Sequence, residues 1–204
     1  MKYSICVSGA AAGKTVEQSK YAAEKVGRAI AKSGHIITTG ATVGLPFYAA
    51  RAAHRAHGAS IGFSPATSLR EHVMKYRLPI GMFDFINFTG LNYVGRDTYM
   101  VQSSDAVITI GGRFGSLHEF ATAIENGTPC GVLTGTGGTA DVLPDLIEKL
   151  EVPHKSSIIF DSDPESLVRR MIEKLDVEIG EIDTSAIANE WFLHGDEEVT
   201  KRAG

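Results

Sequence analysis

A buried strand, a glycine turn and the start of a helix follow one another within residues 104–119, and the other segments of the chain are best interpreted around this run. Ala106 to Ile110 is a short, β-branched apolar segment, as expected for a strand covered on both faces. The turn that follows contains three glycines, Gly111, Gly112 and Gly115. From Leu117 onward the apolar residues have helical spacing. A strand that opens a helix through glycines presents unobstructed amides and the positive end of the helix dipole, which suits a phosphate.

Strand and helix patterns alternate along the rest of the chain, and the alternation predicts parallel strands joined by right-handed crossovers. Strands are expected near residues 3–7, 35–39, 59–63, 83–88, 106–110, 130–133 and 157–160. Helices are expected near residues 15–32, 45–57, 69–75, 92–103, 117–126, 140–150 and 163–175. The predicted fold class is α/β, a doubly wound, mostly parallel Rossmann-like sheet with helices on both faces.

Length and composition favour one folded domain. At 204 residues and 43% hydrophobic content the chain is long enough to bury a full core. We expect residues 1–176 to form a single nucleotide-binding domain. Residues 177–204 are acidic and weakly periodic, with a short helical candidate, Ser185 to Leu193, that contains Trp191. This stretch is expected to be an extension that packs on the domain or on a partner subunit.

Charge and cysteine content exclude several classes of function. The formal net charge is −4, and no run of Lys and Arg interleaved with aromatic residues is present, so no nucleic-acid partner is expected. Cys6 and Cys130 lie in apolar segments without the spacing of a metal site or a disulfide framework. We therefore expect core cysteines, no metal and a reducing compartment. No stretch approaches about 18 consecutive apolar residues, so the prediction is a cytoplasmic protein without a membrane span or signal peptide.

Glycine-rich turns follow three of the expected strands, and the carboxyl ends of parallel strands share one edge of a sheet. Ligands bind at that edge, near the point where the strand order reverses. Besides the glycines at 111–115, the expected ligand-binding positions are Gly9, Gly13, Gly40 and Gly44. Residues 8–15 nearly match the NTPase phosphate loop G-x-x-x-x-G-K-[ST], but Ser8 replaces the first glycine. No later strand is expected to end in the aspartate that supports Mg²⁺, so an NTPase is disfavoured.

Glu119 has two interpretations that spacing alone leaves open. Ser116 and Glu119 have the S-x-x-E spacing of a capping box, in which the glutamate reaches back to the amide of the capping serine. The alternative is a functional carboxylate beside a phosphate site. Arg96 is similarly open, either a phosphate-pairing guanidinium or a surface residue with a long apolar stem. His118 is interpreted as structural or solvent-facing.

These motifs, in this order, resemble the Rossmann-like family often labelled "lysine decarboxylase-like", over roughly residues 3–176. The segments that carry the resemblance are residues 7–13, 39–45, 95–100, 104–105 and 111–119. The family includes the lonely-guy phosphoribohydrolases, which release a cytokinin base from its nucleoside 5′-monophosphate, and the molybdenum cofactor carrier proteins. Decarboxylation is not implied, because nothing in the sequence indicates a pyridoxal-phosphate lysine.

The resemblance implies roles for individual residues. The family's phosphate-binding loop falls on Gly111, Gly112, Gly115 and Ser116, and its catalytic arginine and glutamate fall on Arg96 and Glu119. It implies a small phosphorylated ligand, no required cofactor, and either hydrolysis of a nucleoside 5′-monophosphate or non-catalytic carriage of a nucleotide or phosphorylated pterin. A homo-oligomer, a dimer or a tetramer, is also implied, with contacts through the helices that begin near Asn92 and Leu117.

Departures from the hydrolase pattern make binding better supported than turnover. The hydrolases usually have proline before the double glycine, threonine in the loop and lysine after the arginine. Here Ile110, Ser116 and Asp97 stand at these positions. The second turn also lacks the usual glycine triplet.

Overall fold

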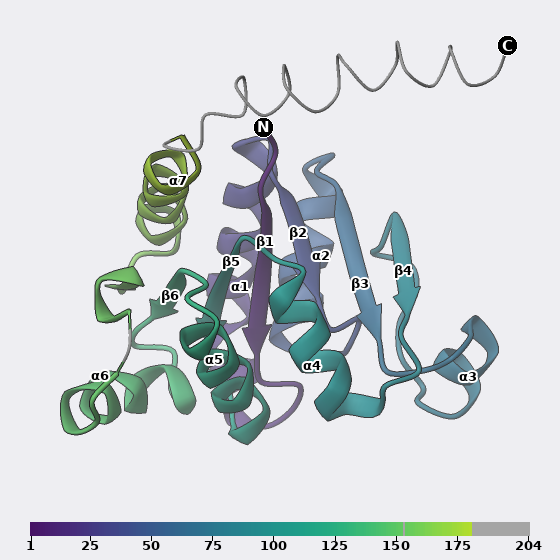
Figure 1. Cartoon of the computed structure of the whole chain (residues 1–204). Coiled ribbons are helices and arrows are strands. Elements are labelled where there is room, and N and C mark those ends of the chain that lie inside the picture. The colour runs from purple at the N-terminus through teal and green to yellow at the C-terminus, as the bar shows by residue number, and fades with distance from the viewer. Residues whose placement is uncertain (153, 181–204) are drawn as a thin grey trace, which may run out of the picture. The chain divides into compact units, whose positions relative to one another are not determined.

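A computed structural model describes residues 1–152 and 154–180 of the chain. Within these residues, seven strands form one sheet in the order β4-β3-β2-β1-β5-β6-β7, and every neighbouring pair is parallel (Figure 1). The strands are β1 (Ser4–Gly9), β2 (Ile36–Thr39), β3 (Ser60–Ser64), β4 (Phe85–Phe88), β5 (Ala106–Ile110), β6 (Cys130–Leu133) and β7 (Ile158–Asp161). The predicted α/β class and the parallel sheet are confirmed.

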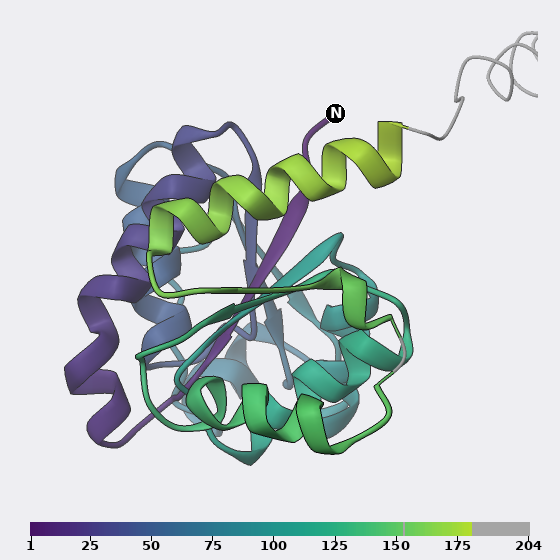
Figure 2. The same cartoon turned by 90° about the vertical axis from the view of Figure 1, so that its left-hand side faces the viewer.

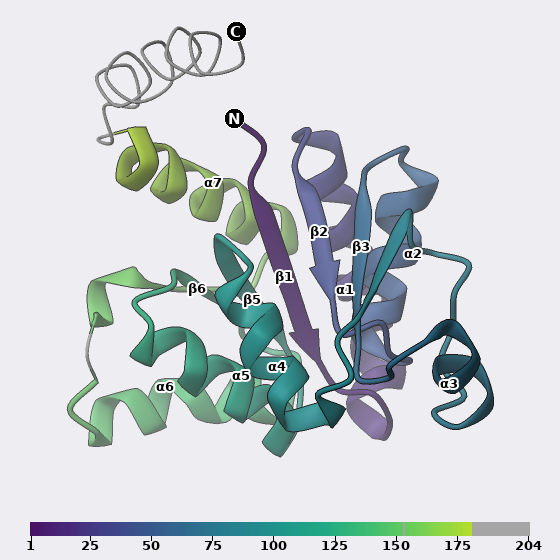
Figure 3. The ribbon, with the colours of Figure 1, turned by 45° about the vertical axis from the view of Figure 1, so that its right-hand side comes forward.

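Helices cover both faces of the sheet, as the alternation predicts. They are α1 (Lys14–Lys32), α2 (Leu45–Arg55), α3 (Leu69–Met74), α4 (Asn92–Gln102), α5 (Phe114–Glu125), α6 (Thr139–Lys149) and α7 (Pro164–Gly180). Helices α1 and α2 pack together on one face, whereas α4, α5 and α6 lie on the other (Figures 1 and 2). The short helix α3 lies beside the edge strand β4 (Figure 3). Within the described residues, no helix combines the length and the apolar character that crossing a membrane requires.

The strand order reverses between β1 and β5. From β1 the chain proceeds outward through β2, β3 and β4, and α4 then returns it to the other side of β1. The loops after β1 and β5 therefore diverge to opposite faces and leave a crevice at the carboxyl edge of the sheet. Strand β5 is buried at every position, which explains its continuous β-branched sequence.

The core between the sheet and helices α4, α5 and α6 is built from small and branched apolar residues. Its buried members include Met100, Val107, Phe120, Ile124 and Leu143. Cys6 and Cys130 are both buried and unpaired, as expected for core cysteines. Burial raises the pKa of the Cys130 thiol to about 12, which keeps it protonated at neutral pH.

The structure corrects three local expectations. Helix α5 begins at Phe114 rather than Leu117, because Gly111 and Gly112 already complete the turn by accepting hydrogen bonds from the amides of Ala140 and Thr139. Strand β7 does end in an aspartate, Asp161, but its carboxylate accepts hydrogen bonds from the start of α7.

Helix α7 continues to Gly180, beyond the predicted end near residue 175. Residues 1–171 form one compact unit, and a second unit begins at residue 172. The predicted boundary between a domain of residues 1–176 and an extension of residues 177–204 stays a prediction. The helical candidate Ser185 to Leu193, with Trp191, lies outside the described residues.

Candidate functional site

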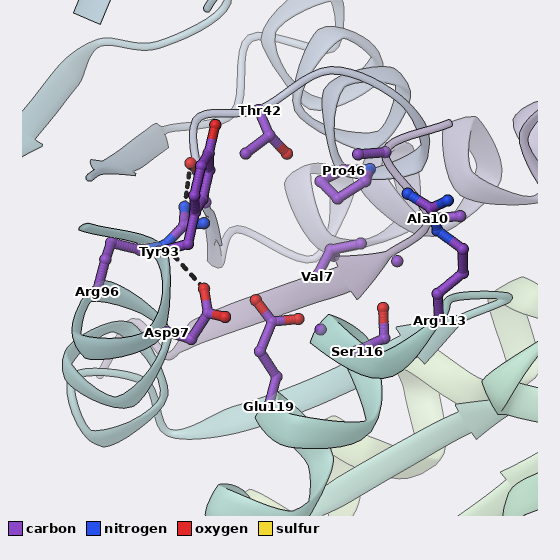
Figure 4. Close-up of a pocket in the computed structure, with 14 residues that line it drawn as sticks. Val7, Ala10, Thr42, Pro46, Tyr93, Arg96, Asp97, Arg113, Ser116 and Glu119 are labelled. Atoms are coloured by element: carbon purple, nitrogen blue, oxygen red, sulfur yellow. Dashed lines mark hydrogen bonds and ion pairs between the residues drawn. The ribbon is translucent and has the colours of Figure 1, made fainter. Parts of the chain in front are cut away.

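A cavity of about 220 Å³ opens at the carboxyl edge of the sheet, at the reversal of strand order between β1 and β5. It is lined by the turns after β1, β2 and β5 and by the first half of α4 (Figure 4). The lining residues are Val7, Gly9, Ala10, Ala11, Gly40, Thr42, Pro46, Tyr93, Arg96, Asp97, Arg113, Gly115, Ser116 and Glu119. The three glycine turns expected to share one edge of the sheet do converge on one cavity.

The predicted site residues divide into two groups. Gly9, Gly40, Gly115 and Ser116 line the cavity, together with Arg96 and Glu119. The remaining predicted positions, Gly13, Gly44, Gly111 and Gly112, do not line it.

Two of these remaining glycines shape the turns around the cavity. A Cβ on Gly44 would lie 2.2 Å from the carbonyl oxygen of Ala10, so the first two turns pack directly together there. Gly112 has φ 104°, a conformation that L side chains rarely adopt. These positions support the site without facing the cavity.

The start of α5 forms one wall of the cavity. Arg113 is the N-cap residue in extended backbone, and no side chain caps the helix. Gly115 and Ser116 lie in its first turn and line the cavity. A helix start of this kind offers amide donors and a partial positive charge to an anion.

Arg113 adds a full positive charge at the same wall. Its side chain is exposed, lines the cavity and, within the described part of the chain, makes no ion pair. An exposed guanidinium beside uncapped helix amides is a suitable partner for a phosphate, since it donates bidentate hydrogen bonds.

Glu119 does not form the capping box that its spacing allows. Ser116 is inside the helix rather than at its N-cap, and Glu119 instead accepts a hydrogen bond from the Ser8 hydroxyl, at the end of β1. The Glu119 side chain is buried and lines the cavity (Figure 4). The structure therefore excludes the capping interpretation and leaves the carboxylate at the site.

The environment of Glu119 favours its protonated form. Burial raises the pKa of Glu119 to about 7, and the negative charge of Asp97 acts in the same direction. The hydrogen bond from Ser8 and the charge of Arg96 oppose these effects only partly. A carboxyl group whose pKa lies near neutrality exchanges protons readily under ordinary conditions.

Arg96 is buried and engaged with the protein itself. Its Nη1 donates hydrogen bonds to the backbone carbonyls of Gly40 and Phe63, at the ends of β2 and β3. Its Nε lies 2.9 Å from Asp97 Oδ1, an ion pair in which neither atom is aligned for a hydrogen bond. Arg96 thus holds the turn after β2 in place and compensates the charge of Asp97, and it is neither a surface residue nor an unengaged guanidinium.

Asp97 links the buried carboxylate to the surface. Its Oδ2 lies 3.6 Å from Nδ1 of His118, whose side chain is partly exposed. His118 therefore contacts a residue of the site from outside the cavity. Within residues 1–152 and 154–180, no group of three or more His, Cys, Asp or Glu side chains is arranged to hold a metal ion.

The sequence did not predict that the polar side chains of Ser8, Tyr93, Asp97 and Arg113 lie at the site. Asp97 and Arg113 each adjoin a recognised motif residue, and a search of the flanking positions for charged side chains would have found both. Ser8 lies 111 residues from Glu119 in the sequence, so only the strand order brings the pair together.

Similar proteins share this fold over most of their length. The structure of the molybdenum cofactor binding protein from Rippkaea orientalis is 27% identical, with a TM-score of 0.68, covering 86% of this chain and 98% of that one. The molybdenum cofactor carrier protein from Chlamydomonas reinhardtii is 24% identical, with a TM-score of 0.67 and the same coverage.

An archaeal protein is also similar in sequence. A protein of Archaeoglobus fulgidus is 29% identical over 116 residues, 57% of this chain and 71% of its own. The family model of the SLOG cluster4 family matches residues 2–168 of this chain. The predicted likeness is thereby confirmed, and the chain belongs to the SLOG cluster4 family.

Proposed function

We propose that this protein binds a phosphorylated, nucleotide-like ligand and hydrolyses the N-glycosidic bond of a nucleoside 5′-monophosphate. The observation that carries the proposal is that an uncapped helix start and a buried carboxylate of raised pKa line the same cavity. The first feature suits a phosphate. The second suits acid–base chemistry on a bond a short distance from that phosphate.

The 5′-phosphate lies at the start of α5 in this proposal. The amides of Gly115 and Ser116 and the Ser116 hydroxyl donate to its oxygens, and the Arg113 guanidinium pairs with its charge. Arg113, rather than Arg96, takes this role, because Arg96 is already bonded to Gly40 and Phe63. Arg96 acts as a positioning residue that holds Asp97 and the turn after β2.

Glu119 acts on the ribose in its ionised form, which a pKa of about 7 leaves well populated at and above neutral pH. As the bond from C1′ to the base nitrogen breaks, its electrons leave with the base, and the carboxylate of Glu119 stabilises the positive charge that develops on the ribose. A water molecule then adds at C1′ and gives its proton to Glu119. The base takes up a proton from solvent as it leaves, and Glu119 releases the proton that it took from water to solvent before the next turnover. Asp97 supplies the second carboxyl group that glycoside hydrolysis commonly uses, and its contact with His118 connects the pair to solvent.

Incubation with AMP and related monophosphates tests the hydrolase directly, with free base and ribose 5-phosphate as the measured products. We expect the Glu119→Gln variant to release base more slowly by roughly 10²–10⁴-fold, the usual contribution of a positioned acid–base group. Glu125→Gln, an exposed glutamate on the same helix, is the matched control and should retain the parent rate. Absence of base release from the parent, or equal rates for Glu119→Gln and parent, contradicts the proposal.

A second candidate function is carriage of a phosphorylated pterin or nucleotide without turnover. It is supported by the 27% identity to a protein described as binding the molybdenum cofactor, and by the engagement of Arg96 with backbone carbonyls. A ligand that binds only the folded state raises the apparent stability of the protein. Thermal stabilisation by the phosphorylated compound, followed by recovery of that compound intact, would distinguish carriage from hydrolysis. An unchanged melting temperature at saturating ligand would count against both functions.

A further inference from the structure

The cavity has two chemically different ends. At one end stand Arg113 and Ser116, and at the other stand Tyr93 and Thr42, with the Glu119 carboxylate between them (Figure 4). Arg96 and Asp97 at the Tyr93 end form an ion pair with each other, whereas a phosphate accounts for the end that carries Arg113. The opposite end carries an aromatic ring to which the proposed chemistry assigns no role.

Tyr93 is held in a fixed orientation although it is exposed. Its ring is 5.6 Å from that of Tyr76, edge-on at 84°, and the guanidinium carbon of Arg96 lies 5.8 Å from its centroid. Yet 46% of the residue remains accessible to solvent. An aromatic side chain that is braced by neighbours but left uncovered provides a preorganised apolar surface.

The backbone that presents Tyr93 is itself unusual. Asn92, the first residue of α4, has φ 54°, which is a left-handed conformation at a helix start. The Asn92 amide donates to the carbonyl of Pro65, and its side chain accepts a hydrogen bond from the Tyr76 hydroxyl at 2.9 Å. The loop after β3 and the residues after α3 thus fix the helix start from two directions. Uncommon backbone conformations that are held in this way are concentrated at ligand sites.

We infer that Tyr93 is the platform on which the planar ring system of the ligand stacks, and that this contact selects ligands carrying an aromatic base. The inference rests on the proposed function, because it places the base opposite the phosphate. A ligand laid along the cavity then has its phosphate at Ser116 and Arg113, its ribose over Glu119 and its base on Tyr93. Tyr76 and Asn92 are positioning residues that hold the platform.

The test compares ligands with and without the base. Binding of AMP and of ribose 5-phosphate is measured by calorimetry in the Glu119→Gln background, where AMP remains intact, and ribose 5-phosphate is measured again in the parent. We expect Tyr93→Ala and Tyr93→Leu to weaken AMP binding by roughly 5- to 100-fold, the range that stacking of a base on an aromatic side chain supplies. Ribose 5-phosphate should bind with unchanged affinity, which also shows that the variants are folded.

Two controls isolate the ring. Tyr93→Phe keeps the stacking surface and should bind AMP with the same affinity as the protein that retains Tyr93. Tyr21→Ala removes an exposed ring, 67% accessible, on α1 and outside the cavity lining, and should have no effect on either ligand.

The results distinguish a failure of the stacking role of Tyr93 from a failure of the proposed function. Suppose that the protein binds AMP, and that Tyr93→Leu either weakens the binding of AMP and of ribose 5-phosphate equally or weakens the binding of neither. The stacking role of Tyr93 is then wrong, and the proposed function stands. If the protein with Tyr93 intact binds neither compound, the proposed function fails and the inference fails with it. A loss confined to AMP supports both.

Discussion

Glu119 is the residue whose role depends most on its surroundings. In the sequence its spacing from Ser116 fits a helix cap and a functional carboxylate equally well. In the structure its hydrogen bond goes to Ser8, across the junction of two parallel strands. A buried carboxyl group that does not stabilise a helix start costs folding free energy when ionised, so its presence is better explained by function than by stability.

The raised pKa of Glu119 predicts a specific dependence of stability on pH. The pKa of Glu119 is about 7 in the folded protein, against an ordinary value of 4.5 that we take for the unfolded chain, so the folded state binds the proton more tightly. The stabilisation is complete below about pH 4.5 and is lost as pH rises through 7. Glutamine does not titrate. The unfolding free energy of the parent minus that of Glu119→Gln should therefore fall by on the order of 2–3 kcal/mol between pH 4.5 and pH 8, because only the parent loses this stabilisation.

Urea unfolding at several pH values measures this difference. Glu125→Gln is again the control, because Glu125 is exposed on the same helix and its replacement should leave the pH dependence of the parent unchanged. If the unfolding free energies of the parent and of Glu119→Gln change with pH in parallel, Glu119 has the same pKa in the folded and the unfolded protein. The raised pKa would then be wrong.

At the residue scale, sequence patterns predict where a residue lies in the fold better than they predict which residues it contacts. The sequence named Glu119 and Arg96 as candidate site residues, because each adjoins a recognisable turn or motif, and both line the cavity. Their contacts with Ser8 and with the carbonyls of Gly40 and Phe63 were not predictable, since these residues are between 33 and 111 positions away along the chain.

At the scale of elements, hydrophobic periodicity predicted each described strand and helix to within a few residues. The end of α7 was predicted about five residues too early, and the start of α5 was predicted three residues too late, where a capping motif indicated Ser116. The amides of Thr139 and Ala140, from the start of α6, hold the preceding turn, and no local pattern records a hydrogen bond from so distant a segment.

The packing of α1 on α2 depends on one glycine. A Cβ on Gly27 would lie 2.0 Å from the carbonyl oxygen of Ala49, so the two helix backbones touch at this point. Gly→Ala within a helix ordinarily stabilises by up to about 1 kcal/mol. Here we expect Gly27→Ala to destabilise the protein by roughly 1–3 kcal/mol, the usual cost of overpacking, because backbone rather than a flexible side chain must move.

Denaturant unfolding with Gly115→Ala as control tests the close approach of α1 and α2. Gly115 is also helical, and a Cβ there would meet no atom within 4 Å, so its replacement should be neutral or slightly stabilising. If Gly27→Ala stabilises the protein as Gly115→Ala does, the helices are farther apart than described.

At the scale of the whole molecule, the site joins the two halves of the sheet. Tyr93, Arg96 and Asp97 come from the helix that returns from β4, whereas Arg113, Ser116 and Glu119 follow β5. The sequence predicted a shared edge because alternating strands and helices imply a parallel sheet. It did not predict the size of the cavity or its aromatic end, which depend on how α4 lies against α5.

Apolar side chains are exposed on α4 and at the start of α5, the two helices through which the oligomer is predicted to form. Val94 and Tyr99 are exposed at 68% and 44%, and Phe114 at the start of α5 at 87%. Exposed apolar side chains on adjacent helices are typical of protein–protein contacts. We predict a homo-oligomer through α4 and α5, with a mass in solution that is a multiple of 21.8 kDa.

Light scattering after size-exclusion chromatography, with charge substitutions in α4, tests this contact. Val94→Glu places a charge in the expected contact and should shift the protein toward the monomer, because burying an unpaired carboxylate is strongly unfavourable. Val142→Glu makes the same change at a similarly exposed position, 59%, on α6, and should leave the assembly intact. A monomeric parent would refute the oligomer, whereas dissociation by Val142→Glu alone would move the contact from α4 to α6.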